Sequence, residues 1–176
     1  ALYREAGVGS QAFGSEITEA RQLHGKELSF NNYVDMDAAW GAANYFADTV
    51  VAIIKHTNPC GVAKGETVLA AYKKALECDP VSAFGGIVAS NRRIDEETAN
   101  EIAGLFVEVV IAPGYTPKAL SILKEKKNIR IMEMGEQSIG KPFSGLDYKR
   151  VSGGMLVQEP DTAQLGINEF KVVTKK

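Results

Sequence analysis

The sequence VVAIIKHTNPCG occupies residues 50–61 and joins a buried-strand pattern to reactive side chains. Its first five residues are apolar, which is typical of a buried strand, and Lys55 and His56 end the run. Asn58-Pro59 then predicts the end of regular structure and a turn of small residues. Open α/β sheets bind ligands beyond the carboxyl ends of their strands, so a strand that ends in Lys-His predicts a chemical site.

Lys55 and His56 have the side chains that proton transfer and charge stabilisation require. A histidine gains or loses a proton near neutral pH, and a lysine supplies positive charge where negative charge develops. The alternative is that Lys55 marks the point where the strand reaches water and that His56 caps the turn, because polar residues at strand ends are common. The local sequence leaves both interpretations open.

Helical and strand patterns alternate on both sides of this stretch. Asp35, Asp95 and Thr116 are predicted N-caps, and Pro117 suits the first position of a helix. The predicted helices cover residues 35–47, 66–78, 95–103 and 116–123; the predicted strands cover 50–56, 87–90, 107–112, 128–134 and 147–158; residues 1–24 and 135–147 are predicted to be mostly loop. This alternation indicates a layered α/β architecture.

Composition restricts the class of protein. The chain has 176 residues, of which 45% are hydrophobic and 24% charged, as is typical of a soluble globular domain. A net charge of −2 does not indicate a nucleic-acid-binding surface, and no apolar run approaches the ~20 residues of a membrane span. Cys60 and Cys78 form no C-x-x-C pair, which fits free thiols in the cytosol. Because the chain opens on alanine, we expect a fragment of a longer protein.

Four further segments are candidates for a site. The glycines in residues 82–86 (SAFGG) let a backbone approach a ligand closely, although the segment lacks a P-loop pattern and also suits a tight turn. Glu108 interrupts an apolar strand and must therefore be paired, exposed at a strand end or functional. The polar residues within 24–32 either line a site or form a solvated loop, and Lys149-Arg150 before Ser-Gly-Gly suits either an anion-binding loop or an ordinary turn.

A catalytic metal is not expected. Two distant histidines and no clustered cysteines do not form a zinc-binding set. The deaminase pattern H-x-E…P-C-x-x-C fails because Asn58 and Ala63 stand where the glutamate and the second cysteine belong. A Cys60–His56 nucleophilic pair is conceivable but not favoured, since residues four apart across a turn need not face each other.

Five blocks carry a resemblance to a known family. They are GKELSFNN (25–32), KHTNPCGVA (55–63), DPVSAFGG (79–86), VEVVIAPG (107–114) and KRVSGG (149–154). In this order they resemble the formyltransferase part of the bifunctional AICAR transformylase/IMP cyclohydrolase family, over nearly the whole chain from Leu2 to Lys176.

The resemblance implies a fold and an activity. The implied fold is a three-layer α/β/α, cytidine-deaminase-like subdomain with a mixed sheet and no zinc, with residues 1–176 as the first of two such subdomains. The implied activity transfers a formyl group from the co-substrate 10-formyltetrahydrofolate to AICAR in purine (IMP) biosynthesis, and a separate domain closes the product to IMP. The implied setting is a cytoplasmic homodimer with active sites at the subunit interface, and neither nucleic acid nor a membrane is an expected partner.

The resemblance also implies roles for single residues. It assigns proton transfer to His56 and stabilisation of an oxyanion to Lys55. The substrate-binding positions that it implies are Asn32, Ser82, Phe84, Gly85, Glu108 and Arg150. Asn32 and Arg150 would lie near the nucleotide, and Glu108 near the folate.

Two departures from the family pattern limit what is expected of residues 1–176 alone. An arginine-tyrosine-glycine segment of the family would precede this sequence, and the second subdomain would follow it. Little or no formyltransferase activity is therefore expected from these residues by themselves. The alternatives are a zinc-free deaminase relative, which the missing ligands disfavour, and a folding or dimerisation module without chemistry.

Overall fold

The computed structural model describes residues 17–135, 146–161 and 169–174, which belong to two compact units. The first unit lies within residues 1–141 and contains a six-stranded sheet with four α-helices. The second lies within residues 142–176 and contains a two-stranded sheet. Each unit is described by itself.

The predicted helices and strands of the first unit occur in the predicted order, and residues 58–64 form a further strand that was not predicted. In chain order they are η1 (Ile17–Glu19), β1 (Arg21–His24), α1 (Phe30–Asn44), β2 (Val50–Lys55), β3 (Asn58–Lys64), α2 (Val68–Cys78), β4 (Ile87–Ser90), α3 (Glu96–Ala103), β5 (Val109–Ala112), α4 (Pro117–Lys124) and β6 (Arg130–Glu133). Among the residues that the sequence assigned to loop, 1–16 and 136–145 lie outside the described part.

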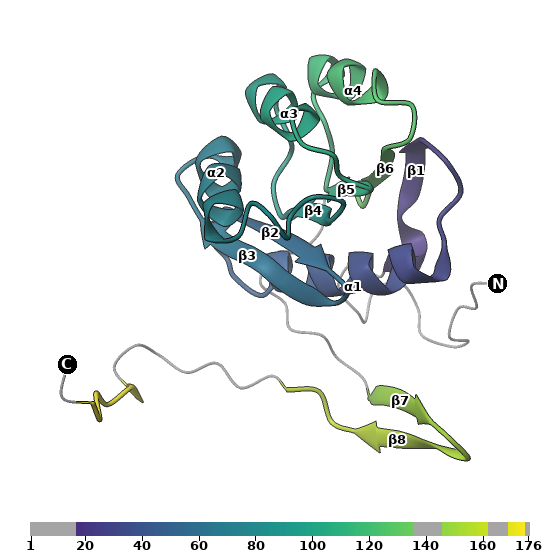
Figure 1. Cartoon of the computed structure of the whole chain (residues 1–176), viewed down its shortest axis with the longest axis vertical. Coiled ribbons are helices and arrows are strands. Elements are labelled where there is room, and N and C mark those ends of the chain that lie inside the picture. The colour runs from purple at the N-terminus through teal and green to yellow at the C-terminus, as the bar shows by residue number, and fades with distance from the viewer. Residues whose placement is uncertain (1–16, 136–145, 162–168, 175–176) are drawn as a thin grey trace. The chain divides into compact units, whose positions relative to one another are not determined.

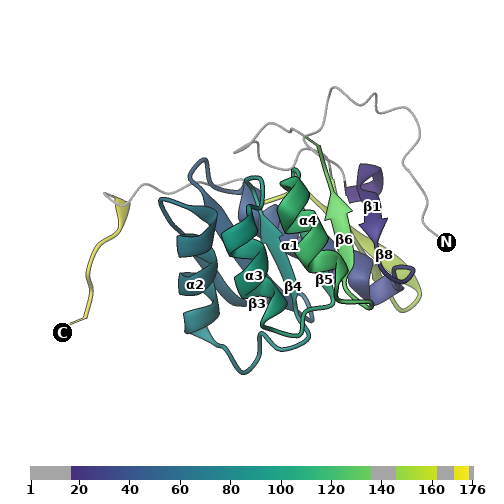
Figure 2. The same ribbon diagram turned by 90° about the horizontal axis from the view of Figure 1, so that it is seen from above.

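The first unit has three layers. Helix α1 covers one face of the sheet, and α2, α3 and α4 lie side by side on the other (Figures 1 and 2). Strand β2 is buried on both faces, so its alternate side chains enter two different cores. Val51 and Ile53 pack in the core beneath α2, α3 and α4, whereas Ile54 packs with Met36 and Trp40 of α1. The three-layer α/β/α prediction is confirmed.

The sheet is mixed, as predicted. Its strand order is β1-β6-β5-β4-β2-β3. Strands β4, β5 and β6 are parallel, whereas β2 is antiparallel to both of its neighbours and β1 is antiparallel to β6. The carboxyl end of β2 therefore lies beside the amino ends of β4, β5 and β6. This border of the sheet, which is formed by strand ends, is called the edge below.

Three predicted helix starts are confirmed and one is wrong. The side chains of Thr67, Asp95 and Thr116 each accept a backbone N–H and cap α2, α3 and α4. Helix α1 begins earlier than predicted, because Ser29 caps it in a capping box, and Asp35 lies within the helix.

The predicted Asn-Pro turn is also wrong. The chain turns one step earlier, at His56-Thr57, and Asn58-Pro59 begins strand β3. β3 is the last strand of the sheet, and an edge strand tolerates proline because one side of its backbone has no neighbouring strand. The register shifts between Ile53 and Ile54, next to this proline.

The second unit contains a hairpin. Strands β7 (Asp147–Val151) and β8 (Gly154–Gln158) pair antiparallel, which confirms the extended segment predicted there. Gly153 in the connection has a φ of +78°, a conformation that glycine adopts without steric cost.

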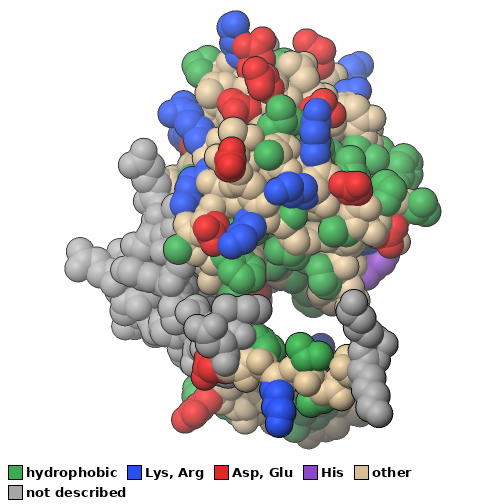
Figure 3. Space-filling view, turned by 90° about the vertical axis from the view of Figure 1, so that its left-hand side faces the viewer, with side chains coloured by type: hydrophobic (Ala, Val, Ile, Leu, Met, Phe, Trp, Pro, Cys, Tyr) green, Lys and Arg blue, Asp and Glu red, His purple; other side chains and the backbone are tan. Residues whose placement is uncertain are grey.

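Charges of both signs are interspersed on the surface of the first unit. Figure 3 shows Lys and Arg side chains among Asp and Glu side chains over the face that it presents. Within the described residues, no helix is long and apolar enough to cross a membrane.

Candidate functional site

The predicted site residues of the first unit lie at one edge of the six-stranded sheet. Ile54, next to Lys55 at the end of β2, is paired with Ile87 at the start of β4. The Glu108 N–H donates to the Gly86 carbonyl (2.9 Å), and the Arg130 N–H donates to the Glu108 carbonyl (3.0 Å). The carboxyl ends of β2 and β1 lie at this edge, beside the amino ends of β4, β5 and β6, and a site beyond the end of β2 stays a prediction.

Lys55 is fixed against the segment 82–86. Its Nζ donates a hydrogen bond to the Phe84 carbonyl oxygen at 2.8 Å, and its side chain is partly buried. The sequence predicted both residues as site members without predicting that they touch. The bond holds a positive charge at the sheet edge and leaves two further ammonium protons for a ligand.

His56 stands next to Lys55 in the two-residue turn between β2 and β3. Its φ is +52° and that of Thr57 is +62°. The Thr57 hydroxyl and the Asn58 amide both donate to the His56 carbonyl, at 2.7 and 2.8 Å. The residue is exposed, so its imidazole is accessible to a substrate.

Segment 82–86 forms a compact turn that presents an aromatic surface. The Asp79 carboxylate accepts the Ser82 N–H at 2.9 Å, and hydrogen bonds from the Ser82 hydroxyl and N–H hold the pKa of Asp79 below its usual value. Gly85 has a φ of +76° and donates to the Phe106 carbonyl at 2.7 Å. The Phe84 and Phe106 rings lie 5.1 Å apart and are 56% and 49% exposed, so they offer a flat ligand a stacking surface.

Glu108 links three elements at this edge. It lies just before β5, not inside it, and its side chain is 44% exposed. One carboxylate oxygen accepts a hydrogen bond from the Asn32 amide at 2.8 Å and lies 3.8 Å from Nη1 of Arg130. The sequence left open whether Glu108 is paired, exposed or functional. The structure shows that the carboxylate is paired and also reaches the surface.

Asn32 is buried and already has structural partners. Its side-chain oxygen accepts from the Ser29 N–H and hydroxyl, both at 3.0 Å, while its amide donates to Glu108. It therefore supports the start of α1 and the position of Glu108. Its implied contact with a nucleotide stays a prediction.

One candidate belongs to the second unit. Arg150 belongs to β7 in the second unit, where it is paired with Met155 and exposed. Its implied place near the nucleotide stays a prediction.

Three residues at the edge were missed as site members. Asp35 was interpreted as a helix cap, Phe106 lies in the segment between α3 and β5, and Arg130 was assigned to an ordinary strand. Arg130 also donates from Nε to the Glu27 carbonyl at 3.0 Å. No local pattern identifies these residues, because each acquires its role from a partner distant in sequence.

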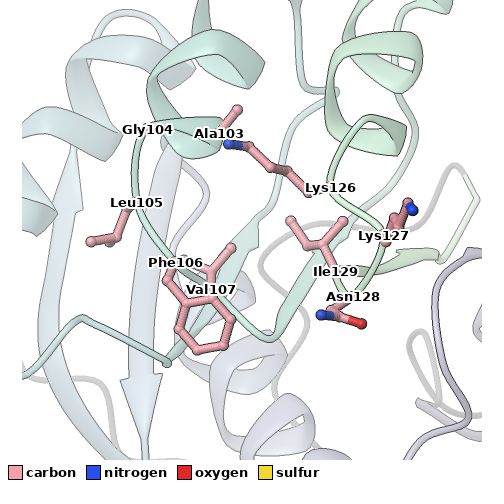
Figure 4. Close-up of a pocket in the computed structure, with 9 residues that line it drawn as sticks. All are labelled: Ala103, Gly104, Leu105, Phe106, Val107, Lys126, Lys127, Asn128 and Ile129. Atoms are coloured by element: carbon pink, nitrogen blue, oxygen red, sulfur yellow. The ribbon is translucent and has the colours of Figure 1, made fainter.

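A pocket lies beside the aromatic pair. Its volume is about 270 Å³, and its lining residues are Ala103, Gly104, Leu105, Phe106, Val107, Lys126, Lys127, Asn128 and Ile129 (Figure 4). Phe106 belongs both to the pocket and to the aromatic pair. Figure 4 shows the Lys126 side chain extending toward the end of α3 near Gly104. The pocket thus combines apolar walls with two cationic side chains.

The structure does not favour a cysteine nucleophile. Burial raises the pKa of the Cys60 thiol, the Asp79 carboxylate raises it further, and Lys55 only partly opposes this. The thiol is therefore protonated near neutral pH. Within the described ranges, no three or more His, Cys, Asp or Glu side chains are grouped so that they could hold a metal ion.

Comparison with known proteins shows the family of the chain. A family model described as the AICARFT/IMPCHase bienzyme matches residues 1–176. The chain belongs to this family. Three relatives of the AICARFT/IMPCHase bienzyme family carry the name bifunctional purine biosynthesis protein PurH. The protein from Petrotoga mobilis is 54% identical over 159 residues, which is 90% of this chain and 30% of the relative.

The other two relatives carry the same name. The protein from Acetivibrio thermocellus is 48% identical over 175 residues, which is 99% of this chain and 33% of the relative. The protein from Rhodospirillum rubrum is 52% identical over 160 residues, which is 91% of this chain and 30% of the relative. The chain thus spans about a third of the length of its AICARFT/IMPCHase relatives.

Proposed function

We propose that this chain supplies the Lys-His edge of an AICAR formyltransferase site, which uses 10-formyltetrahydrofolate as formyl donor. The observation that carries the proposal is the bond between the Lys55 ammonium and the Phe84 carbonyl, because it fixes a cation beside His56 and an aromatic surface. Membership in the AICARFT/IMPCHase family supports this reaction over other formyl transfers.

The proposed chemistry begins with attack of the AICAR amino nitrogen on the formyl carbon. A carbon–nitrogen bond forms, and the formyl oxygen becomes an oxyanion in a tetrahedral adduct. Lys55 stabilises this negative charge, and His56 accepts the proton that the amine loses. The adduct then collapses, the bond from the formyl carbon to N10 breaks, and N10 takes up a proton to give tetrahydrofolate.

The surroundings suit the two substrates. A folate is flat at one end and carries carboxylates at the other, and the edge offers the Phe84–Phe106 pair next to a pocket with Lys126 and Lys127. Ser82 and Gly85 lie in the same turn, where they would contact substrate. Glu108 and Asn32 complete the proposed binding set of the first unit. Arg150, which belongs to the second unit, is proposed separately as a residue that binds the nucleotide.

The proposal extends to the setting of the chain. Residues 1–176 would be the first of two transformylase subdomains, acting within a cytoplasmic homodimer that also closes formyl-AICAR to IMP. Because the chain spans about a third of its relatives, the remaining contacts would come from other segments of the whole protein.

The test uses the whole bifunctional protein with His56→Ala. We expect formyl transfer to fall by about 10²–10⁴-fold, the usual contribution of a general base, while cyclohydrolase activity is unchanged. The cyclohydrolase is an internal control for folding and concentration. Retained formyl transfer would remove His56 from the mechanism.

A second measurement separates the site from a purely structural module. Calorimetric titration of residues 1–176 with AICAR and with a folate analogue reports whether this chain retains part of the site. Binding of either ligand that is weakened by Lys55→Met supports the proposal. Absence of binding to both the chain and the whole protein would favour a module for folding or dimerisation.

A further inference from the structure

The carboxylate of Asp35 holds both N–H groups of the turn that carries His56. Oδ2 accepts the His56 N–H at 3.1 Å, and Oδ1 accepts the Thr57 N–H at 2.8 Å. The two bonds use both oxygens, so they fix the turn in orientation as well as in distance. They also join α1 to the β2–β3 hairpin.

This turn needs external support. A two-residue hairpin turn of the primed type requires positive φ at both positions, for which Asn-Gly is the preferred sequence. Here His56 and Thr57 adopt φ values of +52° and +62°, and they are the non-glycine residues with positive φ in the described part of the chain. A β-branched residue in this region is a steric outlier, and such strain persists only where the surroundings hold it.

Asp35 is well placed to hold the His56-Thr57 turn in this conformation. It lies in the second turn of α1, a helix capped by Ser29 and anchored in the core by Met36, Ala39 and Trp40. A carboxylate on a packed helix is a fixed acceptor, unlike one on a loop.

We propose that Asp35 is a positioning residue for His56. It acts through the backbone of the turn, and the imidazole is thereby aimed at the edge where Lys55 and the aromatic pair lie. This inference rests on the proposed function for its effect on catalysis, but the positioning itself can be measured without activity.

The catalytic test compares Asp35→Asn with Asp37→Asn in the whole bifunctional protein. The asparagine oxygen keeps one of the two bonds, so folding is preserved, whereas the second N–H of the turn loses its acceptor. We expect Asp35→Asn to lower kcat of formyl transfer by about 10- to 100-fold, as for a reacting group displaced by about 1 Å. We expect KM for AICAR to change by less than about threefold, because the bond orients a reacting group and does not bind substrate. Asp37 lies on the same helix and accepts neither N–H of the turn, since both bond to Asp35, so its variant should keep wild-type kcat.

A rescue variant separates positioning from a general structural role. Glycine adopts positive φ without a Cβ clash, so Thr57→Gly lowers the strain that Asp35 opposes. Adding Thr57→Gly to Asp35→Asn should restore at least part of kcat. If the double variant stays as slow as Asp35→Asn, the turn is not the route of the effect and the inference fails.

The measurement without activity uses the histidine signals of the 176-residue chain. The chain has two histidines, His24 and His56, so the His56→Ala spectrum assigns both imidazoles by NMR. In Asp35→Asn the His56 signals should shift or broaden while those of His24 stay in place. Unchanged His56 signals together with wild-type kcat would overturn the inference. If instead His56→Ala leaves formyl transfer intact, the proposed function fails, whereas a shifted His56 signal would still show the positioning.

Discussion

The Asn32 amide nitrogen lies 2.8 Å from a carboxylate oxygen of Glu108, although 76 residues separate the two in sequence. One of these residues lies in the first turn of α1, and the other precedes β5. The bond therefore ties the start of the helix to the sheet edge that carries the candidate site.

Replacement of Asn32 tests the contribution of this hydrogen bond to stability. Asn32→Ala removes the capping-box partner of Ser29 and the donor to Glu108, so we expect a loss of about 1–3 kcal/mol in the free energy of unfolding. Urea denaturation of the chain measures it. The control is Asn31→Ala, an exposed neighbour in the same turn, which should change stability by less than about 0.5 kcal/mol. Equal transition midpoints for the two variants would contradict the structural role of Asn32.

Glu108→Gln distinguishes pairing from ligand binding. A glutamine oxygen still accepts the Asn32 amide. The ion pair with Arg130 is long, at 3.8 Å, and Glu108 is 44% exposed, so the pair is worth less than about 1 kcal/mol and stability should fall little. If Glu108 faces the folate, affinity for a folate analogue should fall about tenfold, or about 1.4 kcal/mol. Calorimetric titration of the whole protein and urea denaturation give the two values. A larger loss of stability than of affinity would make the carboxylate structural.

Cys60 provides a test of the mechanism. Its thiol pKa lies above the ordinary value, so at pH 7 its thiolate fraction is below that of an ordinary cysteine and rises only at more alkaline pH. We expect iodoacetamide to modify exposed Cys78 before half-buried Cys60, as followed by mass spectrometry. Cys60→Ala should keep formyl transfer within about twofold, since the change touches no reacting group. Loss of transfer at unchanged stability would revive the nucleophilic pair.

Two glycines should respond in opposite directions to the same substitution. A Cβ on Gly61 would lie 2.0 Å from the Ala75 carbonyl oxygen, so Gly61→Ala must separate β3 from α2 and should cost more than about 2 kcal/mol. Gly41 on α1 has no neighbour within 4 Å of such a Cβ, so Gly41→Ala should stabilise the helix by about 0.5–1 kcal/mol. Thermal unfolding of both variants measures the difference. A stable Gly61→Ala protein would show that β3 and α2 do not pack as described.

The sequence determined those features that depend on neighbours along the chain. The caps at Asp95 and Thr116 were predicted because a capping side chain bonds to a backbone N–H only three positions away. The apolar run of residues 50–54 predicted a buried strand for the same reason, since it is a pattern of neighbours along the chain. The Lys55-His56 pair was visible as polar residues that end this run.

Tertiary structure decided the rest. Pro59 was predicted to end regular structure, yet it lies in β3. It is tolerated there because β3 is the outermost strand of the sheet, and no local pattern specifies which strand is outermost. Asp35 was predicted to cap α1, whereas the structure has Ser29 as the cap and Phe30 as the first residue of the helix. Likewise, the partners of Lys55, Glu108 and the His56 turn come from segments 29, 76 and 21 residues away. Hydrogen bonds depend on position in space, so the fold alone could bring these groups together into a candidate site.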